Sequence, residues 1–204
     1  MTSADYRANA RYLLGGLIFA REWLMATVAC LITVIRGILE AIPTKDTYVG
    51  VVLSLIGLIV SSVLAGPIAY GICSYFLRLS RDGASRLENV IDGFTNDFLG
   101  NFVLSFMQGL LIFLWSLLLF IPGIIKSYAY SMAFYVKNDH PEYGWKECLD
   151  ESRRIMNGNK WRLFCLQFSF IGWYILGSLC LGIGTVFVTP YQQAAVTEFY
   201  EDIK

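Results

Sequence analysis

Charged residues are scarce in this chain, and their scarcity excludes an ordinary soluble domain. Only 16% of the 204 residues are Asp, Glu, Lys or Arg, whereas 56% are hydrophobic. A soluble domain typically has about 25% charged residues and about 45–50% apolar ones. A chain this short cannot bury so much apolar surface in water, because its surface is large relative to its volume. The composition therefore indicates an integral membrane protein whose apolar side chains face lipid.

An excess of positive charge is also missing. The 16 Lys and Arg residues balance the 16 Asp and Glu residues, so the formal net charge is zero. A protein that binds nucleic acid usually carries a basic face or stripe. We therefore expect no nucleic-acid partner.

Residues that commonly perform catalysis or bind metal ions are few and scattered. The chain has one histidine, His140, and its neighbour Pro141 is typical of a turn. No HExxH, GxSxG or P-loop pattern occurs. The five cysteines form no CxxC pair, which favours buried free thiols over a metal or redox site; they are Cys30, Cys73, Cys148, Cys165 and Cys180. We expect no enzyme activity, no cofactor and no metal centre.

Long hydrophobic runs, in contrast, extend over most of the chain. Six apolar segments lie at about residues 23–42, 48–77, 98–121, 124–136, 161–181 and 183–200. A helix needs ~20 apolar residues to cross a hydrocarbon core ~30 Å thick. The fourth and sixth segments can span only if other helices enclose them. We predict an all-α, polytopic transmembrane bundle of about six helices, which forms a single domain over residues 1–204.

A weak internal repeat predicts how these helices pair. Three times, a long apolar helix ends near a proline, and a second helix returns with an aromatic pair. Proline at such places either begins the returning helix or kinks it. We therefore predict three proline-linked hairpins. The proline sites are Gly66-Pro67, Pro122-Gly123 and Pro190-Tyr191, and the aromatic pairs are Tyr75-Phe76, Phe134-Tyr135 and Phe199-Tyr200.

The distribution of Lys and Arg predicts the orientation of the bundle. These residues gather before the first segment, between segments two and three, between segments four and five, and at the end of the chain. The opposite connections hold only Lys45 and, nearby, Lys126. By the positive-inside rule, both termini and the two long loops are cytoplasmic. The predicted cytoplasmic parts include the N-terminal residues 1–21 and the loops 78–97 and 137–160.

Both long loops carry apolar residues at helical spacing, so we predict two amphipathic helices on the cytoplasmic side. In the first loop the apolar positions include Leu87, Val90 and Phe94. The second helix, 145–156, ends before Gly158 and offers an Asp150–Arg154 pair at i,i+4. Such a helix lies in the headgroup layer or docks another membrane or cytoplasmic protein.

Ionisable and polar residues inside apolar segments are the candidate ligand-contacting residues. Arg36, Glu40 and Lys126 lie near the outer ends of their segments. They line an outward-facing mouth, grip a lipid headgroup, or extend to the interface as isolated charges. The two short segments contribute four more residues, which either line a polar cavity or join neighbouring helices. These four are Tyr128, Tyr130, Gln192 and Gln193.

The run from Leu114 to Lys126, with the proline and glycine at Pro122-Gly123, and the later motif Phe199-Tyr200 resemble a bacterial membrane family called domain of unknown function 975 (DUF975). The likeness is dense from about Trp115 onward and includes the run LWSLLLFIPGIIK at 114–126. It implies a bacterial cytoplasmic-membrane protein. More distantly, such proteins resemble the membrane domains of some glycerophosphodiester phosphodiesterases, but this chain has no room for their catalytic barrel. The motif residues expected to be structural are Pro122, Gly123, Gly158, Lys160, Gly172, Trp173, Pro190, Tyr191, Phe199 and Tyr200.

These observations favour a non-enzymatic membrane module that binds membrane lipids, or binds a protein partner through the 145–156 helix. The alternative is a small transporter or exporter component, in which the two short helices line a path.

Overall fold

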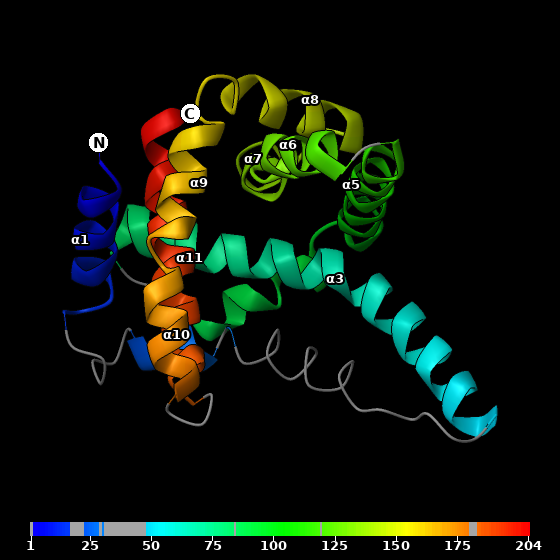
Figure 1. The fold of residues 1–204 in the computed structure, drawn as a ribbon, viewed down its shortest axis with the longest axis horizontal. Coiled ribbons are helices and arrows are strands. Elements are labelled where there is room, and N and C mark those ends of the chain that lie inside the picture. Colours follow the sequence, from blue (N-terminus) through cyan, green and yellow to red (C-terminus); the bar gives the residue numbers. More distant parts are fainter. Residues whose placement is uncertain are drawn as a thin grey trace.

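The protein folds into helices that cross one another around a shared core (Figure 1). The computed structural model describes residues 2–16, 23–28, 30, 48–83, 85–118, 120–179 and 183–204. All regular structure in these ranges is helical, which confirms the predicted all-α class. Most of the first predicted segment, including Arg36 and Glu40, lies outside the described residues.

The second predicted segment forms α3, Tyr48–Asp82, which extends further than expected. Pro67 lies inside this helix and does not end it. Three glycines allow the backbone of α3 to approach neighbouring elements closely, since a Cβ on each would overlap a backbone carbonyl of another element. Gly66 and Gly71 of α3 meet Asn101 and Val90, and Gly93 meets Pro67. Close backbone packing thus supports the helix around the proline.

The first long loop follows α3 and folds back along it. It contains η1, Leu87–Val90, and α4, Asp92–Thr95, in place of one amphipathic helix. Both short helices pack against α3. Val90 is buried, whereas Ile91 and Phe94 are exposed. The predicted continuous helix is therefore wrong here, because the backbone must approach α3 closely at two points.

The middle of the chain forms α5, Phe98–Leu118, α6, Phe120–Tyr130, and α7, Ala133–Asp139. Pro122 lies in the first turn of α6, where a missing backbone N–H costs little. The predicted fourth segment, 124–136, is not one helix. It breaks at a turn through Ser131 and Met132, and the Ser152 hydroxyl accepts a hydrogen bond from the Met132 N–H there.

The C-terminal part consists of α8, Trp145–Ile155, α9, Lys160–Phe168, α10, Ile171–Leu179, and α11, Ile183–Ile203. The predicted fifth segment, 161–181, is divided between α9 and α10 at Ser169 and Phe170. In α11, the helix continues through Pro190. The N-terminal helix α1, Ser3–Leu13, is capped by Thr2 and packs against α9 and α11.

The helices do not all run parallel. Figure 1 shows α3 crossing α11, which it contacts, while α8 lies over α6 and α7. Among the described residues, two helices are long and apolar enough to cross a membrane: Ser61–Asp82 within α3, and α5. A six-span bundle is not confirmed, because turns divide the fourth and fifth predicted segments.

Candidate functional site

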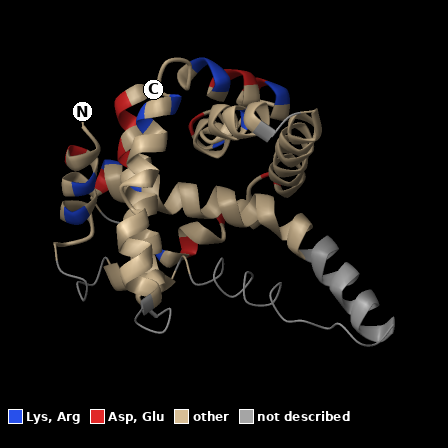
Figure 2. Ribbon diagram, in the orientation of Figure 1, with Lys and Arg blue, Asp and Glu red and all other residues tan. Residues whose placement is uncertain are grey.

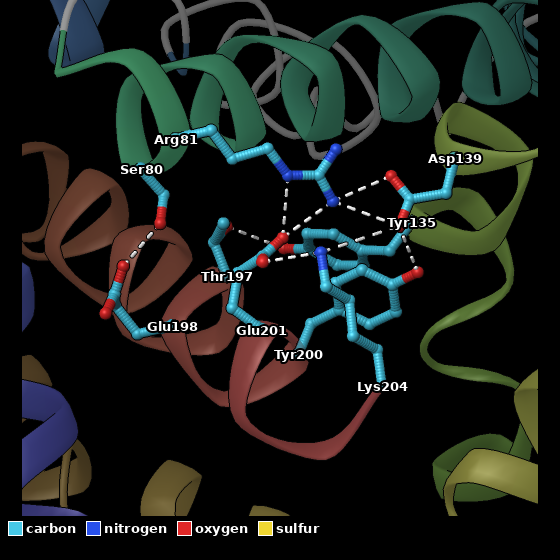
Figure 3. Close-up of polar contacts among 9 residues, drawn as sticks. All are labelled: Ser80, Arg81, Tyr135, Asp139, Thr197, Glu198, Tyr200, Glu201 and Lys204. Atoms are coloured by element: carbon cyan, nitrogen blue, oxygen red, sulfur yellow. Dashed lines mark hydrogen bonds and ion pairs between the residues drawn. The ribbon is translucent and has the colours of Figure 1, made fainter.

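Charged side chains gather toward one end of the molecule. Figure 2 shows them on α1, on α8 and where α11 ends and α9 begins, whereas most of α5, α6 and α10 carries none. Figure 3 shows the contacts among nine of the residues at this end, which we call the polar network. The polar network comprises Ser80, Arg81, Tyr135, Asp139, Thr197, Glu198, Tyr200, Glu201 and Lys204.

The guanidinium of Arg81 is the centre of the polar network (Figure 3). Its Nη2 lies 2.7 Å from Asp139 Oδ1 and 2.7 Å from Glu201 Oε1. Tyr200 donates to Asp139 Oδ2 at 2.9 Å, and Lys204 pairs with Glu201. Arg81 belongs to α3, Asp139 to α7 and Glu201 to α11. One cation therefore joins the C-terminal ends of three helices that are distant in sequence.

Buried contacts support this centre from within the core. The Tyr135 ring stacks on the Tyr200 ring with centroids 5.0 Å apart, and the Tyr135 hydroxyl lies 3.2 Å from the Thr197 hydroxyl. Ser80 donates to Glu198 Oε1 at 2.5 Å. Because these groups come from α3, α7 and α11, they hold the same three helices in register.

A second charged cluster joins α1, α9 and α11. Arg162 Nη2 lies 2.7 Å from Asp202 Oδ2, and the Tyr6 hydroxyl donates to the same oxygen at 2.5 Å. The hydrogen bonds from Tyr6 and Arg162 lower the pKa of Asp202. Burial, reinforced by the Asp202 acceptor, raises the pKa of Tyr6 to about 12. The tyrosine therefore stays protonated at neutral pH and acts as a hydrogen-bond donor.

A third cluster surrounds Lys137, which is only 5% exposed. Its ammonium donates to the carbonyls of Pro141 and Tyr143, at 2.8 and 2.9 Å, and pairs with Asp97 Oδ2 at 2.9 Å. The hydrogen bond from Lys137 is the main cause that lowers the pKa of Asp97. This contact fixes the loop before α8 to the start of α5.

Two surface cavities lie beside these clusters. One, of about 240 Å³, is bounded by α7, α8 and α11 and includes Asp139, Arg154 and Lys204. The other, of about 330 Å³, lies between the start of α5 and the loop before α8, and includes Lys137 and Trp145. Most of the charged residues that line these two cavities pair with one another. The charged clusters therefore stabilise the packing of the helix ends. Within the described ranges, no group of three His, Cys, Asp or Glu residues is placed to hold a metal ion.

Most residues of the polar network lie between residues 117 and 204. This segment matches the family described as protein of unknown function DUF975. The match supports the predicted family over α6 to α11, and the DUF975 segment contributes Asp139, Glu201 and Lys204 to the polar network. Arg81 lies before it. Comparisons with curated proteins and with solved structures gave no match. A likeness to glycerophosphodiester phosphodiesterases is not shown.

The structural motif residues of the DUF975 segment occupy turns and helix contacts. Gly158 has a φ of +83° in the turn between α8 and α9, a conformation that glycine adopts without strain. Tyr191 is buried between Phe170 and Trp173, with ring centroids at 5.0 and 6.4 Å. Gly123 lies against Ser116. The remaining motif residues begin α9 or lie within α6, α10 and α11: Pro122, Lys160, Gly172, Pro190, Phe199 and Tyr200.

The predicted ligand-contacting residues are only partly brought together. Lys126 lies over the Tyr130 ring, 5.9 Å from its centroid. Tyr128 instead donates to Gln167 of α9 at 2.9 Å, and Gln192 accepts from Tyr174 of α10 at 2.5 Å. Neither described cavity includes these residues or Gln193. The Tyr128 and Gln192 side chains thus join neighbouring helices.

The predicted amphipathic helix at 145–156 is present as α8, but its apolar stripe packs on the protein's own helices. Cys148, Leu149, Ser152 and Ile155 are buried. Ser152 donates to the Ala129 carbonyl at 2.9 Å. The predicted Asp150–Arg154 pair is replaced by two i,i+3 pairs, Arg153–Asp150 and Arg154–Glu151.

Large apolar side chains are exposed on four helices, α5, α6, α9 and α10. Leu117 is 72% exposed, Ile121 71% and Phe168 62%. Further exposed large apolar residues lie on α5, α6, α9 and α10, namely Phe106, Leu110, Phe113, Leu114, Leu118, Ile124, Ile125, Trp161, Ile171, Trp173, Ile175 and Leu176. Extensive exposed apolar surface is typical of sites that contact a protein or a membrane.

Proposed function

We propose that this chain is a non-enzymatic integral membrane protein that binds membrane lipids. The observation that carries the proposal is the exposed apolar surface on α5, α6, α9 and α10. In water this surface would be costly, since burying apolar area contributes about 25 cal/mol per Å². Lipid chains that cover it remove that cost.

The dimensions of α5 support this placement. Its 21 residues extend about 32 Å at 1.5 Å per residue, close to the ~30 Å of a hydrocarbon core. Few of its residues are buried, whereas Ser61–Asp82 of α3 is mostly buried. In this proposal α5 faces lipid and α3 lies inside the protein.

The charged end supports a cytoplasmic location for both termini. α1 and the C-terminal end of α11 are joined there by Tyr6 and Asp202. The C-terminal end of α7 meets the end of α3 in the same region, through Asp139 and Arg81. These are the parts that the positive-inside rule assigns to the cytoplasm of a bacterial cell. We propose a six-segment, multi-pass arrangement with this end inside.

The polar residues of the fourth and sixth predicted segments favour lipid binding over transport. A transport path needs polar groups that are free to contact a solute. The Tyr128 hydroxyl and the Gln192 side-chain oxygen are instead engaged by partners on neighbouring helices. These contacts support a packed module.

Labelling of single cysteines tests the membrane location and orientation. The native cysteines are replaced by serine or alanine, and either Lys146→Cys on α8 or Ile121→Cys on α6 is introduced. In intact cells, a membrane-impermeant maleimide should label only Ile121→Cys. In inverted vesicles it should label Lys146→Cys.

Two results contradict the proposal. Release of the protein from membranes by alkaline carbonate would exclude integral insertion. Labelling of Lys146→Cys in intact cells would place the charged end outside.

A further inference from the structure

Lys126 is an isolated cation within a long apolar region. Between Phe98 and Val136 it is the single charged residue. A charged side chain in such a region is costly unless it reaches a counter-charge or water. Its surroundings therefore indicate what it contacts.

Aromatic rings hold the Lys126 ammonium on the surface of the α5–α6 pair. Nζ lies 4.8 Å from the Trp115 ring centroid and 5.9 Å from that of Tyr130. Within the described part of the chain, no Asp or Glu forms an ion pair with it. The rings orient the ammonium, and its positive charge has no anionic partner among these residues.

Lys126 lies far from Asp97, the residue that precedes α5, when the distance is followed along that helix. Asp97, which pairs with Lys137, immediately precedes α5, and Trp115 is 18 positions later. At 1.5 Å per residue, this separation is about 27 Å along the helix. That distance is close to the ~30 Å hydrocarbon thickness. If Asp97 lies at one membrane surface and α5 crosses the membrane, Trp115 and the Lys126 ammonium beside it lie near the other.

Exposed aliphatic residues lie close to Lys126 and Trp115 in the sequence. Leu117, Leu118, Ile121 and Ile125 are all exposed on α5 and α6. A ligand suited to this place has a negative headgroup near Lys126 and hydrocarbon chains along these residues. Tryptophan at the headgroup level is typical of membrane interfaces.

We propose that Lys126 binds the phosphate of an anionic phospholipid in the leaflet reached by the C-terminal end of α5. The ammonium pairs with the phosphate, Trp115 and Tyr130 orient it, and the acyl chains lie along the exposed aliphatic residues. This inference rests on the proposed membrane location and names the lipid class.

Native mass spectrometry of the full-length protein in detergent tests the proposal. The protein is titrated with phosphatidylglycerol or phosphatidylcholine, and retained lipid is counted. We expect the wild type to prefer phosphatidylglycerol and Lys126→Ala to lose about fivefold in that preference, the amount expected of one lysine. Lys126→Arg should keep the preference. Lys146→Ala is the matched control, because it removes a lysine from the charged end.

Several outcomes overturn the assignment. One is equal preference in the wild type and Lys126→Ala, and another is an equal loss in Lys146→Ala. Thermal unfolding of each variant in the same detergent shows that it is folded; if Lys126→Ala does not fold, loss of preference in Lys126→Arg overturns the assignment instead. Carbonate extraction separates the two proposals, since a wild type that resists extraction but shows no lipid preference refutes only the Lys126 site.

Discussion

At the scale of single residues, Arg81 has the largest structural role in the polar network. Its guanidinium reaches one carboxylate on α7 and another on α11 from its own position on α3. Asp139 Oδ2 also accepts from Tyr200. Charge-assisted hydrogen bonds of this kind are stronger than neutral ones. Removal of Arg81 takes away the closer cation of Asp139 and leaves the two carboxylates to Lys204, which lies 3.9 Å from Asp139 Oδ2.

We predict that Arg81→Ala lowers the free energy of unfolding by about 1–3 kcal/mol, because hydrogen bonds to charged groups contribute about that much. The measurement is thermal unfolding in detergent. Arg153→Ala is the control, since the Arg153–Asp150 pair is solvent-exposed at 3.7 Å and should contribute within about 0.5 kcal/mol. An equal effect of the two substitutions would contradict a special role for Arg81.

At the scale of elements, backbone contact determines how α3 packs. A side chain at Gly71 would overlap the Val90 carbonyl of η1, and one at Gly93 would overlap the Pro67 carbonyl of α3. Gly109 of α5 is also in a helix, but a Cβ there would meet no atom within 4 Å. Replacement by alanine should therefore have opposite effects on stability at Gly71 and Gly109, which both lie within helices.

We predict that Gly71→Ala lowers the unfolding temperature, because η1 must move away from α3. Gly109→Ala should raise the free energy of unfolding by up to about 1 kcal/mol, since alanine favours helix over glycine. Circular dichroism during heating measures both. If Gly71→Ala is as stable as Gly109→Ala, the close approach of η1 to α3 is refuted.

At the scale of the whole molecule, one end is charged and another surface is apolar (Figure 2). Carboxylates at the charged end have lowered pKa values, among them Asp97, opposite Lys137, and Asp202, beside Tyr6 and Arg162. A carboxylate with a lowered pKa in the folded protein stabilises the fold above the pKa of the unfolded chain. That contribution is lost as the pH falls through the folded value.

We predict that stability decreases as the pH falls below about 4, near the ordinary pKa of aspartate. Asp97→Asn should be less stable than the wild type at pH 7, and the two should converge in acid. Asparagine suits this position, because Asp97 has a φ of +50° that asparagine tolerates. Unfolding temperatures measured from pH 7 to pH 3 check this. A constant difference between the two proteins would show that the Asp97 charge does not contribute.

The sequence by itself determined the helical class, the location of apolar helices such as α5 and α11, and the isolation of Lys126 in an apolar region. These properties depend on composition and on periodicity along one segment, which are local. The predicted positions at which helices end were less accurate. Pro67 lies within a helix, whereas the turn at Ser131 divides a predicted one, because contacts with other helices override local preference.

Only the tertiary structure decided which charged residues meet. Arg81 and Glu201 are 120 positions apart, and Tyr6 and Asp202 are 196 apart. Their pairing depends on how α1, α3 and α11 cross, which no single-segment pattern contains. The same reason explains α8, whose amphipathic pattern was evident but whose apolar stripe packs on α6 and α7. A sequence pattern shows that a face is to be buried, and the packing of distant helices determines what buries it.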